Sequence, residues 1–344
     1  MTTLARPIPT ASRDEARGML LGLAGVAMFS LTLPFTRMAV AELDPLFIAL
    51  GRALGAALLA GLWLGWRRAP LPPRAALAPL VLVALGVVIG FPLLSSMALR
   101  WVPATHGAVL AGLLPLLTAL YSAMRGDERP SAAFWLMAVL GAALVIAFAL
   151  SQGGGALHLA DLLMFLAVAA GAVGYAEGGR LARTLGGPET ISWALLLALP
   201  LVAPLLAWHY IPRPEAFAGV GAAAWAGLAY MTVFSMFVGF FFWYRGLALG
   251  GIARVGQVQL LQPFLSLVGA ALLLGEPLTL ATWLVAGDGK LAMQRRFQLV
   301  RDSDGATVLR GCWDLVCIEI GSGRPRRMPA EFLDTYMPAV VQAS

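Results

Sequence analysis

The chain has 344 residues, of which 60% are hydrophobic and 12% are charged, and its mean hydropathy is +0.81. Soluble domains carry about 25% charged residues, so this composition excludes an ordinary soluble protein and indicates one embedded in a lipid bilayer. The formal net charge is +6, but the Lys and Arg residues lie in short segments between apolar runs. This placement is typical of membrane anchoring and orientation, and we expect no nucleic-acid partner.

Residues 1–17 are polar, and the apolar run behind them is too long for the hydrophobic region of a signal peptide. We expect a cytoplasmic N-terminal segment without a cleaved signal. A membrane-spanning helix needs about 20 mostly apolar residues. The segments that meet or approach this length are 18–41, 45–66, 75–99, 103–123, 131–150, 159–176, 189–209, 220–243 and 252–274. A tenth begins near Leu278, so the sequence predicts an all-α polytopic membrane protein.

Positive charge collects behind every second span. The basic residues in these segments are Arg67, Arg68, Arg74, Arg125, Arg129, Arg180, Arg183, Arg245 and Arg254. The alternate connections carry little positive charge, and Arg6, Arg13 and Arg17 precede the first span. Because basic residues favour the cytoplasmic side, we expect the N-terminus to be cytoplasmic.

The chain contains an internal repeat. A shift of 148 residues places Pro115 on Pro263, Glu128 on Glu276 and Trp135 on Trp283, and a slightly larger shift places Gly90-Phe91 on Gly239-Phe240. Pro45 falls on Pro188 at a shift of 143. We therefore predict two repeats of five spans each, at 18–150 and 151–287. An odd number of spans inverts the second copy, as in many secondary transporters.

The second repeat ends abruptly. Behind Trp135 the first copy continues as an apolar helix, whereas behind Trp283 the second copy turns polar and brings Asp288 and Lys290. Each of these charges at the middle of a bilayer would cost about 2.5–3.5 kcal/mol. We therefore expect a truncated tenth helix, a seam at Asp288 and a foreign, soluble tail over 288–344.

The repeats resemble the EamA-type members of the drug/metabolite transporter superfamily. The resemblance is carried by residues 98–135 (ALRWVPATHGAVLAGLLPLLTALYSAMRGDERPSAAFW), by residues 243–283 (WYRGLALGGIARVGQVQLLQPFLSLVGAALLLGEPLTLATW) and by Arg52. The stretch from about 18 to 287 also looks like bacterial amino-acid exporters of that superfamily. The resemblance implies a transporter of a bacterial inner membrane that exports small metabolites, hydrophobic or aromatic amino acids above all, by alternating access.

The tail is similar to another family. Residues 295–332 read as a strand, an Asp-Gly turn, a long strand, a Gly-rich turn and a basic exit into Pro. This order resembles the C-terminal part of hotdog-fold acyl-CoA thioesterases. The portion that would carry their catalytic carboxylate is missing, so we expect no thioesterase activity. A membrane-tethered thioesterase, or another fusion whose tail is the active part, is the alternative function.

Polar residues inside spans are the candidate substrate-binding residues, because they are costly in a bilayer. Arg52 could pair with a substrate carboxylate, or it could bind backbone carbonyls. His106 and Trp101 could form a polar and aromatic cluster for an amphipathic substrate, and a histidine can exchange a proton near neutral pH. The alternative for His106 is a helix-end histidine bonded to the backbone. By the repeat it corresponds to Arg254, at the opposite membrane face.

Glutamines gather in the ninth span, and Gln259 and Gln262 share a face that Gln257 does not. They could line a cavity or make interhelical hydrogen bonds. Weaker candidates are Tyr230, Ser235 and Ser95. Gly pairs such as Gly246/Gly250 favour close packing within the chain, and we expect a monomer.

The remaining chemistry is sparse. Asp161 and Glu177 lie at the ends of the sixth span, so no carboxylate stands at mid-membrane and a buried-carboxylate proton relay has no support. Cys312 and Cys317 have neither Cys nor His partners for a zinc site or a disulfide framework. Residues 287–291 (GDGKL) lack the spacing of a phosphate-binding loop. We expect no enzyme, no metal and no cofactor, only a small-molecule substrate and the bilayer.

Overall fold

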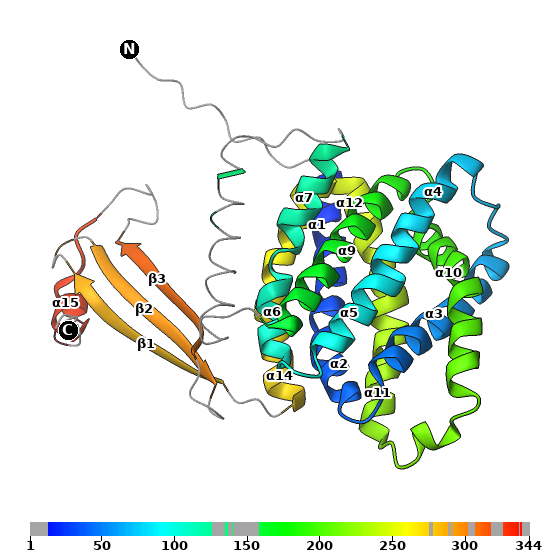
Figure 1. Cartoon of the computed structure of the whole chain (residues 1–344). Helices are drawn as coiled ribbons and strands as arrows, with labels where there is room; N and C mark the ends of the chain where they lie inside the picture. Colours follow the sequence, from blue (N-terminus) through cyan, green and yellow to red (C-terminus); the bar gives the residue numbers. More distant parts are fainter. Residues whose placement is uncertain are drawn as a thin grey trace. The chain divides into compact units, whose positions relative to one another are not determined.

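The computed structural model describes residues 13–125, 135–136, 140, 158–274, 278–287, 290, 292–301, 307–317, 326–336 and 338. The chain divides into two compact units, Met1–Leu274 and Gly275–Ser344. The first unit is helical and the second is built around a sheet (Figure 1).

In its described part the first unit has eight helical segments long and apolar enough to cross a membrane. They are Arg13–Val40, Pro45–Arg67, Arg74–Ala98, His106–Met124, Leu159–Leu181, Gly187–Tyr210, Ala222–Gly250 and Ile252–Leu273. Each coincides with a predicted span, and we number them one to four and six to nine. The predicted fifth span, 131–150, lies almost wholly outside the described residues.

Several spans contain a break. Their segments are α1 (Arg13–Ser30), α2 (Thr32–Val40), α3 (Pro45–Arg67), α4 (Arg74–Val83), η1 (Ala84–Gly90), α5 (Phe91–Ala98), α6 (Ala104–Ala111), α7 (Leu114–Met124), α9 (Leu159–Leu181), α10 (Gly187–Tyr210), η2 (Pro214–Phe217), α11 (Ala222–Tyr230), η3 (Met231–Val238), α12 (Gly239–Gly250), α13 (Ile252–Gly256), η4 (Gln257–Leu261) and α14 (Gln262–Leu274). The eighth span runs to Gly250, further than predicted, so Arg245 lies within its last helix.

The breaks occur at corresponding places in the two predicted repeats. Spans three and eight each contain a π-helix, η1 and η3, just before or at the matched Gly-Phe pair. Spans four and nine are each interrupted ahead of the matched residues Pro115 and Pro263. A π-helical turn widens a helix locally and is frequent at functional sites. These features agree with the repeat read from the sequence, and the full ten-span inverted arrangement stays a prediction.

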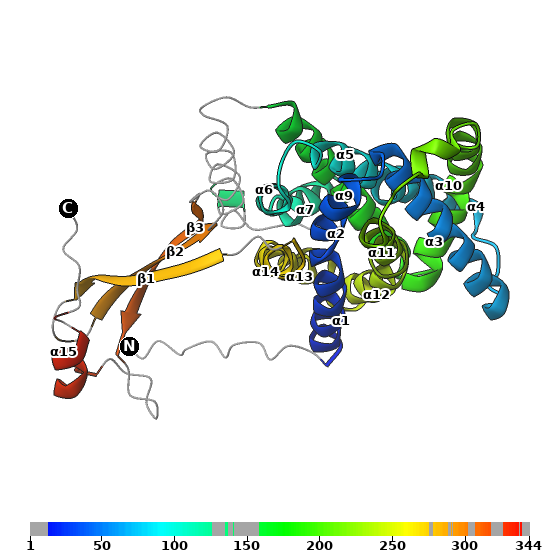
Figure 2. The ribbon, with the colours of Figure 1, turned by 90° about the horizontal axis from the view of Figure 1, so that it is seen from below.

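Glycines allow spans one and eight, and likewise spans three and six, to approach closely. The repeat relates the first of these pairs to the second. A Cβ on Gly18 of α1 would lie 2.7 Å from the backbone nitrogen of Gly250 in α12, so spans one and eight touch backbone to backbone. A Cβ on Gly86 of η1 would lie 2.9 Å from the nitrogen of Gly174 in α9, which brings spans three and six together. Gly246 packs in the same way on Gly22, as the expected intramolecular packing requires. Figure 2 shows α1 beside α12.

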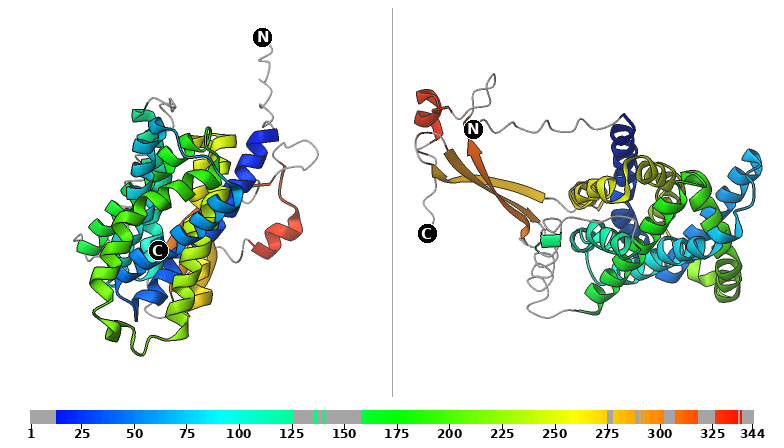
Figure 3. Two further views of the ribbon diagram at one scale, coloured as in Figure 1. Left: turned by 90° about the vertical axis from the view of Figure 1, so that its right-hand side faces the viewer. Right: turned by 90° about the horizontal axis from the view of Figure 1, so that it is seen from above.

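Short connections join most consecutive spans, so the chain runs back and forth between two ends of the bundle (Figures 1 and 3). We call them the Arg13 end and the His106 end. Met124, Leu181 and Ile252 lie at the Arg13 end, whereas Ala104 and His158 lie at the opposite one. The core between the ends is apolar and includes large, fully buried side chains such as Trp243 and Tyr244.

The second unit corrects one prediction. Leu278–Gly287 is strand β1, not a truncated tenth helix, and it pairs antiparallel with β2 (Ala292–Arg301). Strand β3 (Thr307–Val316) completes the sheet in the order β1-β2-β3, and α15 (Ala330–Tyr336) follows. At 1.5 Å per residue, an apolar stretch this short covers about half of a 30 Å hydrocarbon core, and its Thr, Trp and Val residues suit a strand.

Strands β2 and β3 fall where the tail was predicted to hold two strands around an Asp-Gly turn. The core of this unit is small: Leu284, Met293 and Met328 are buried together, with Cys317 and Leu333 packed on them. Cys312 and Cys317 are both free thiols.

Candidate functional site

A cavity lies near the middle of the helical unit, where both predicted repeats contribute. Its volume is about 20 Å³, roughly the space of one water molecule. The lining residues are Phe29, Thr32, Leu33, Arg52, Val87, Phe91, Tyr175, Ser235, Phe240 and Gln262. They come from spans one, two and three of the first repeat and from spans six, eight and nine of the second. Both π-helices reach it, through Val87 and Ser235.

Three polar side chains form a chain of hydrogen bonds in the cavity wall. Arg52 of α3 donates from Nη2 to the hydroxyl of Ser235 in η3 at 3.0 Å. That hydroxyl lies 2.7 Å from the hydroxyl of Thr32, the first residue of α2. The break between α1 and α2 and the π-helix of span eight thus bring these hydroxyls to the guanidinium.

The guanidinium of Arg52 is under-satisfied. The residue is 2% exposed, and its Nε and Nη1 have no hydrogen-bond partner among the described residues. A buried cation left without a partner is strongly destabilising, by about 3–5 kcal/mol in measured cases. Planar guanidinium groups bind carboxylates through two parallel hydrogen bonds. The free donors therefore form a site suited to an anionic group.

Two glutamines of span nine are also buried with unused polar atoms. Gln262, 5% exposed, lines the cavity, and its Oε1 has no partner among the described residues. Gln259 is 1% exposed, and neither its Oε1 nor its Nε2 is paired within the described structure. A buried amide oxygen of this kind can accept from a ligand ammonium or hydroxyl group.

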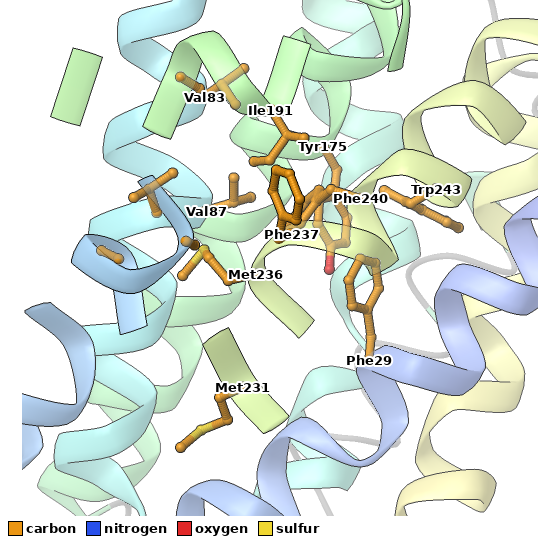
Figure 4. Packing of buried hydrophobic residues seen from close by; sticks show 14 of the residues in the cluster. Phe29, Val83, Val87, Tyr175, Ile191, Met231, Met236, Phe237, Phe240 and Trp243 are labelled. Atoms are coloured by element: carbon orange, nitrogen blue, oxygen red, sulfur yellow. The ribbon is translucent and has the colours of Figure 1, made fainter. Parts of the chain in front are cut away.

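The apolar wall of the cavity is aromatic. The rings of Phe29 and Tyr175 are stacked, with centroids 6.0 Å apart and planes 18° from parallel. Phe240 lies against both, at 4.9 Å from Phe29 and 5.9 Å from Tyr175. Figure 4 shows these three rings together, with Trp243 beside them. Such a wall suits a planar or apolar ligand group.

The structure brings together three of the predicted site residues, Arg52, Ser235 and Gln262. The other six, Trp101, His106, Gln257, Gln259, Tyr230 and Ser95, do not line the cavity. Trp101 is 60% exposed in the connection between α5 and α6, Gln257 donates to its own helix at Ala253, and Ser95 donates to the carbonyl of Pro92. Tyr230 donates to the carbonyl of Met28 and stacks on Phe35.

His106 also lies away from the cavity. Its Nε2 is 2.6 Å from Oδ1 of Asp161, and the side chains are 10% and 6% exposed. The predicted cluster of Trp101, His106 and Gln262 therefore does not form, because His106 begins span four at the end of the bundle whereas Gln262 lies mid-span. The structure agrees better with the alternative prediction, a histidine at a helix end, although its partner is a carboxylate and not the backbone.

A second buried carboxylate lies at the Arg13 end. Glu177 of α9 is fully buried. Its Oε1 accepts from Tyr121 at 2.8 Å and lies 2.9 Å from Nε of Arg125. Its Oε2 is 3.6 Å from Arg180. In the described residues no group of three or more His, Cys, Asp or Glu side chains could hold a metal ion.

Sequence reasoning did not select the aromatic wall or Thr32. Two hydroxyl residues, Ser30 and Thr32, lie close to Pro34 within an apolar span, and this combination was a usable signal for the helix break. The matched pair Gly90-Phe91 and Gly239-Phe240 was noted only as part of the repeat, yet both phenylalanines line the cavity.

Comparison with known proteins agrees with this architecture. The model of the EamA-like transporter family matches residues 16–150 and again residues 158–288. The uncharacterized transporter YdeK of Bacillus subtilis (strain 168) is 48% identical over 259 residues, which cover 75% of this chain and 89% of that protein. A solved crystal structure is 20% identical with a TM-score of 0.56 over 74% of this chain and 89% of its own, a likeness of fold. These matches to transporters give the thioesterase alternative no support.

Proposed function

The chain belongs to the EamA-like transporter family, and we propose that it exports amino acids with hydrophobic or aromatic side chains across a bacterial inner membrane. It is a multi-pass membrane transporter and not an enzyme. The observation that carries the substrate class is Arg52, a buried cation with two unused donors facing an aromatic cavity.

Each part of a zwitterionic amino acid has a counterpart in the cavity wall. The free Nε and Nη1 of Arg52 suit the carboxylate. Gln262 offers its unused Oε1, and Ser235 and Thr32 their hydroxyls, to the ammonium group. The stacked rings of Phe29 and Tyr175, with Phe240, suit an apolar side chain.

The size of the cavity supports transport by alternating access. About 20 Å³ admits a water molecule but no amino acid. The wall is assembled from both predicted repeats, so a relative movement of the halves would enlarge it and open it to one side at a time. We propose that the described conformation is a closed state of this cycle.

The distribution of basic residues supports the direction of insertion. The Arg13 end carries Arg13, Arg17, Arg67, Arg68, Arg74, Arg125, Arg180, Arg183 and Arg254. Connections at the His106 end carry Glu42, Asp44 and Glu215 along with Arg100 and Arg213. By the positive-inside rule the Arg13 end faces the cytoplasm.

The decisive experiment is counterflow in proteoliposomes that hold the purified full chain. Vesicles preloaded with unlabelled tryptophan should accumulate labelled tryptophan, phenylalanine and leucine added outside. Tryptamine, which keeps the ring and the amine but lacks the carboxylate, should compete at least tenfold less well than tryptophan. Equal competition by tryptamine would overturn the role of the carboxylate, and counterflow absent for every amino acid would overturn the substrate class.

A further inference from the structure

Two ion pairs lie at opposite ends of the helical unit, and each joins one predicted repeat to the other. At the His106 end, His106 of α6 pairs with Asp161 of α9 at 2.6 Å. At the Arg13 end, Arg254 of α13 pairs with Glu15 of α1. His106 belongs to the first repeat, and Glu15 lies just ahead of it on α1, the helix that begins span one; Asp161 and Arg254 belong to the second. A movement of one half against the other that separates them at either end would lengthen the pair at that end.

The two pairs occupy equivalent places in the repeat. His106, Asp161 and Arg254 are each the third residue of their helices α6, α9 and α13, and Glu15 lies in the first described turn of α1. Helices α6 and α13 begin spans four and nine, and α9 and α1 begin spans six and one. The stacked rings Phe29 and Tyr175 follow Glu15 and Asp161 at the same distance along the chain. The inverted repeat would therefore place one pair on the other at the opposite end.

We propose that these pairs are reciprocal latches of the transport cycle, one for each end of the central cavity. The inference rests on the proposed function, because it assumes alternating access. Breaking His106–Asp161 opens the cavity towards the His106 end, and breaking Arg254–Glu15 loosens the Arg13 end. Since a ligand can reach the cavity from one side only while the other side is closed, the two latches open in turn.

The latches differ in strength. The side chains of His106 and Asp161 are 10% and 6% exposed, whereas those of Arg254 and Glu15 are 60% and 30% exposed. Exposed ion pairs contribute little because water screens them. The Arg13 end is also held by the ion pair between Arg125, directly after α7, and Glu177 of α9, which again joins the two halves. Loss of the His106 latch should therefore have the larger effect.

Thiol accessibility tests the latches without any substrate. The background is the full chain with Cys312→Ser and Cys317→Ser, and the probe is Ser235→Cys in the cavity. A membrane-impermeant maleimide is added from either face of oriented vesicles. We expect Asp161→Asn to raise labelling from the His106 face at least fivefold and not from the other face. Glu15→Gln should raise labelling from the Arg13 face about twofold.

Two further variants keep the result interpretable if Asp161→Asn folds poorly. His106→Arg copies the chemistry of Arg254, and we expect it to keep labelling low. The charge exchange His106→Asp with Asp161→Arg reverses the signs of the two partners and should restore low labelling. Labelling that rises from both faces alike, or an exchange that leaves labelling high in monodisperse protein, would overturn the latches.

The outcomes separate this inference from the proposed function. Face-specific labelling, together with no amino-acid counterflow by the chain that keeps Ser235, would support the latches and remove the substrate class. Counterflow of amino acids together with labelling unchanged in every latch variant would keep the substrate class and overturn the latches.

Discussion

The two family-matched halves of the helical unit share a backbone plan but differ in their polar groups. Phe29 and Tyr175 stand at equivalent positions of spans one and six, and Phe91 and Phe240 at equivalent positions of spans three and eight. In contrast, the residue equivalent to Arg52 in the other repeat is Leu195, and the residue equivalent to Gln262 is Leu114. Both leucines are buried.

This difference separates two tasks. A symmetric aromatic frame can support the cavity equally well whichever end is open, because each half presents the same surface when the halves exchange roles. An asymmetric set of polar groups gives a bound zwitterion a single favoured orientation. The predictions below test this division, beginning with the largest expected effect.

The largest effect should come from replacing Arg52, the buried cation that has no counterpart in the other repeat. Arg52→Met keeps much of the side-chain volume but removes all donors, and we expect counterflow of tryptophan to fall at least a hundredfold, about 2.7 kcal/mol at 1.36 kcal/mol per tenfold. The matched control is Leu195→Met in the other half, a volume-conserving change that should stay within threefold. Equal losses in the two variants would contradict the assignment of the carboxylate to Arg52.

The symmetric frame should respond symmetrically. Phe29→Leu and Tyr175→Leu each remove one ring of the stacked pair, and an aromatic pair contributes about 0.5–1.5 kcal/mol beyond its buried area. We expect each change to weaken the apparent affinity for tryptophan by roughly three- to tenfold, with the two values within threefold of each other. Concentration-dependent counterflow measures this. A tenfold difference between the two variants would show that the frame is not equivalent in the two halves.

Glu177 tests whether a buried polar network that occurs in only one repeat stabilises the fold. It is buried against Tyr121 and Arg125, whereas the repeat places Leu31 at the corresponding position. Glu177→Gln should lower the free energy of unfolding by about 1.5–3 kcal/mol, the range for hydrogen bonds to charged groups. The loss should be no larger because Arg125 is 43% exposed and water can solvate it. Thermal unfolding in detergent checks this, with Leu31→Met as the control. An unchanged melting temperature for Glu177→Gln would argue against a stabilising network.

The smallest effect on transport should come from the tail. Met293→Ala removes one of the three buried residues of its core, and such changes cost about 2–5 kcal/mol in well-packed cores. We expect proteolysis of the tail to accelerate while counterflow stays within twofold. A larger loss of counterflow would show that the second unit takes part in transport.

In the stretch Leu278–Gly287, similarity of sequence to the family does not predict the secondary structure. The second family match runs to residue 288, so by its sequence this segment continues the transporter repeat. In the structure it is strand β1, paired with β2 over most of its length. Its residues are compatible with either state, and the polar sequence behind it removes the length that a membrane helix needs.

By itself, the sequence determined the class of protein, the places of the eight described spans, the repeat and three of the residues that line the cavity. These follow from hydropathy and from the cost of polar groups in a bilayer, both of which are local properties. The tertiary structure decided which polar residues face one another. It paired His106 with Asp161 and Arg52 with Ser235, and it left Trp101 exposed, because such contacts depend on how helices distant in sequence pack and where π-turns shift their register.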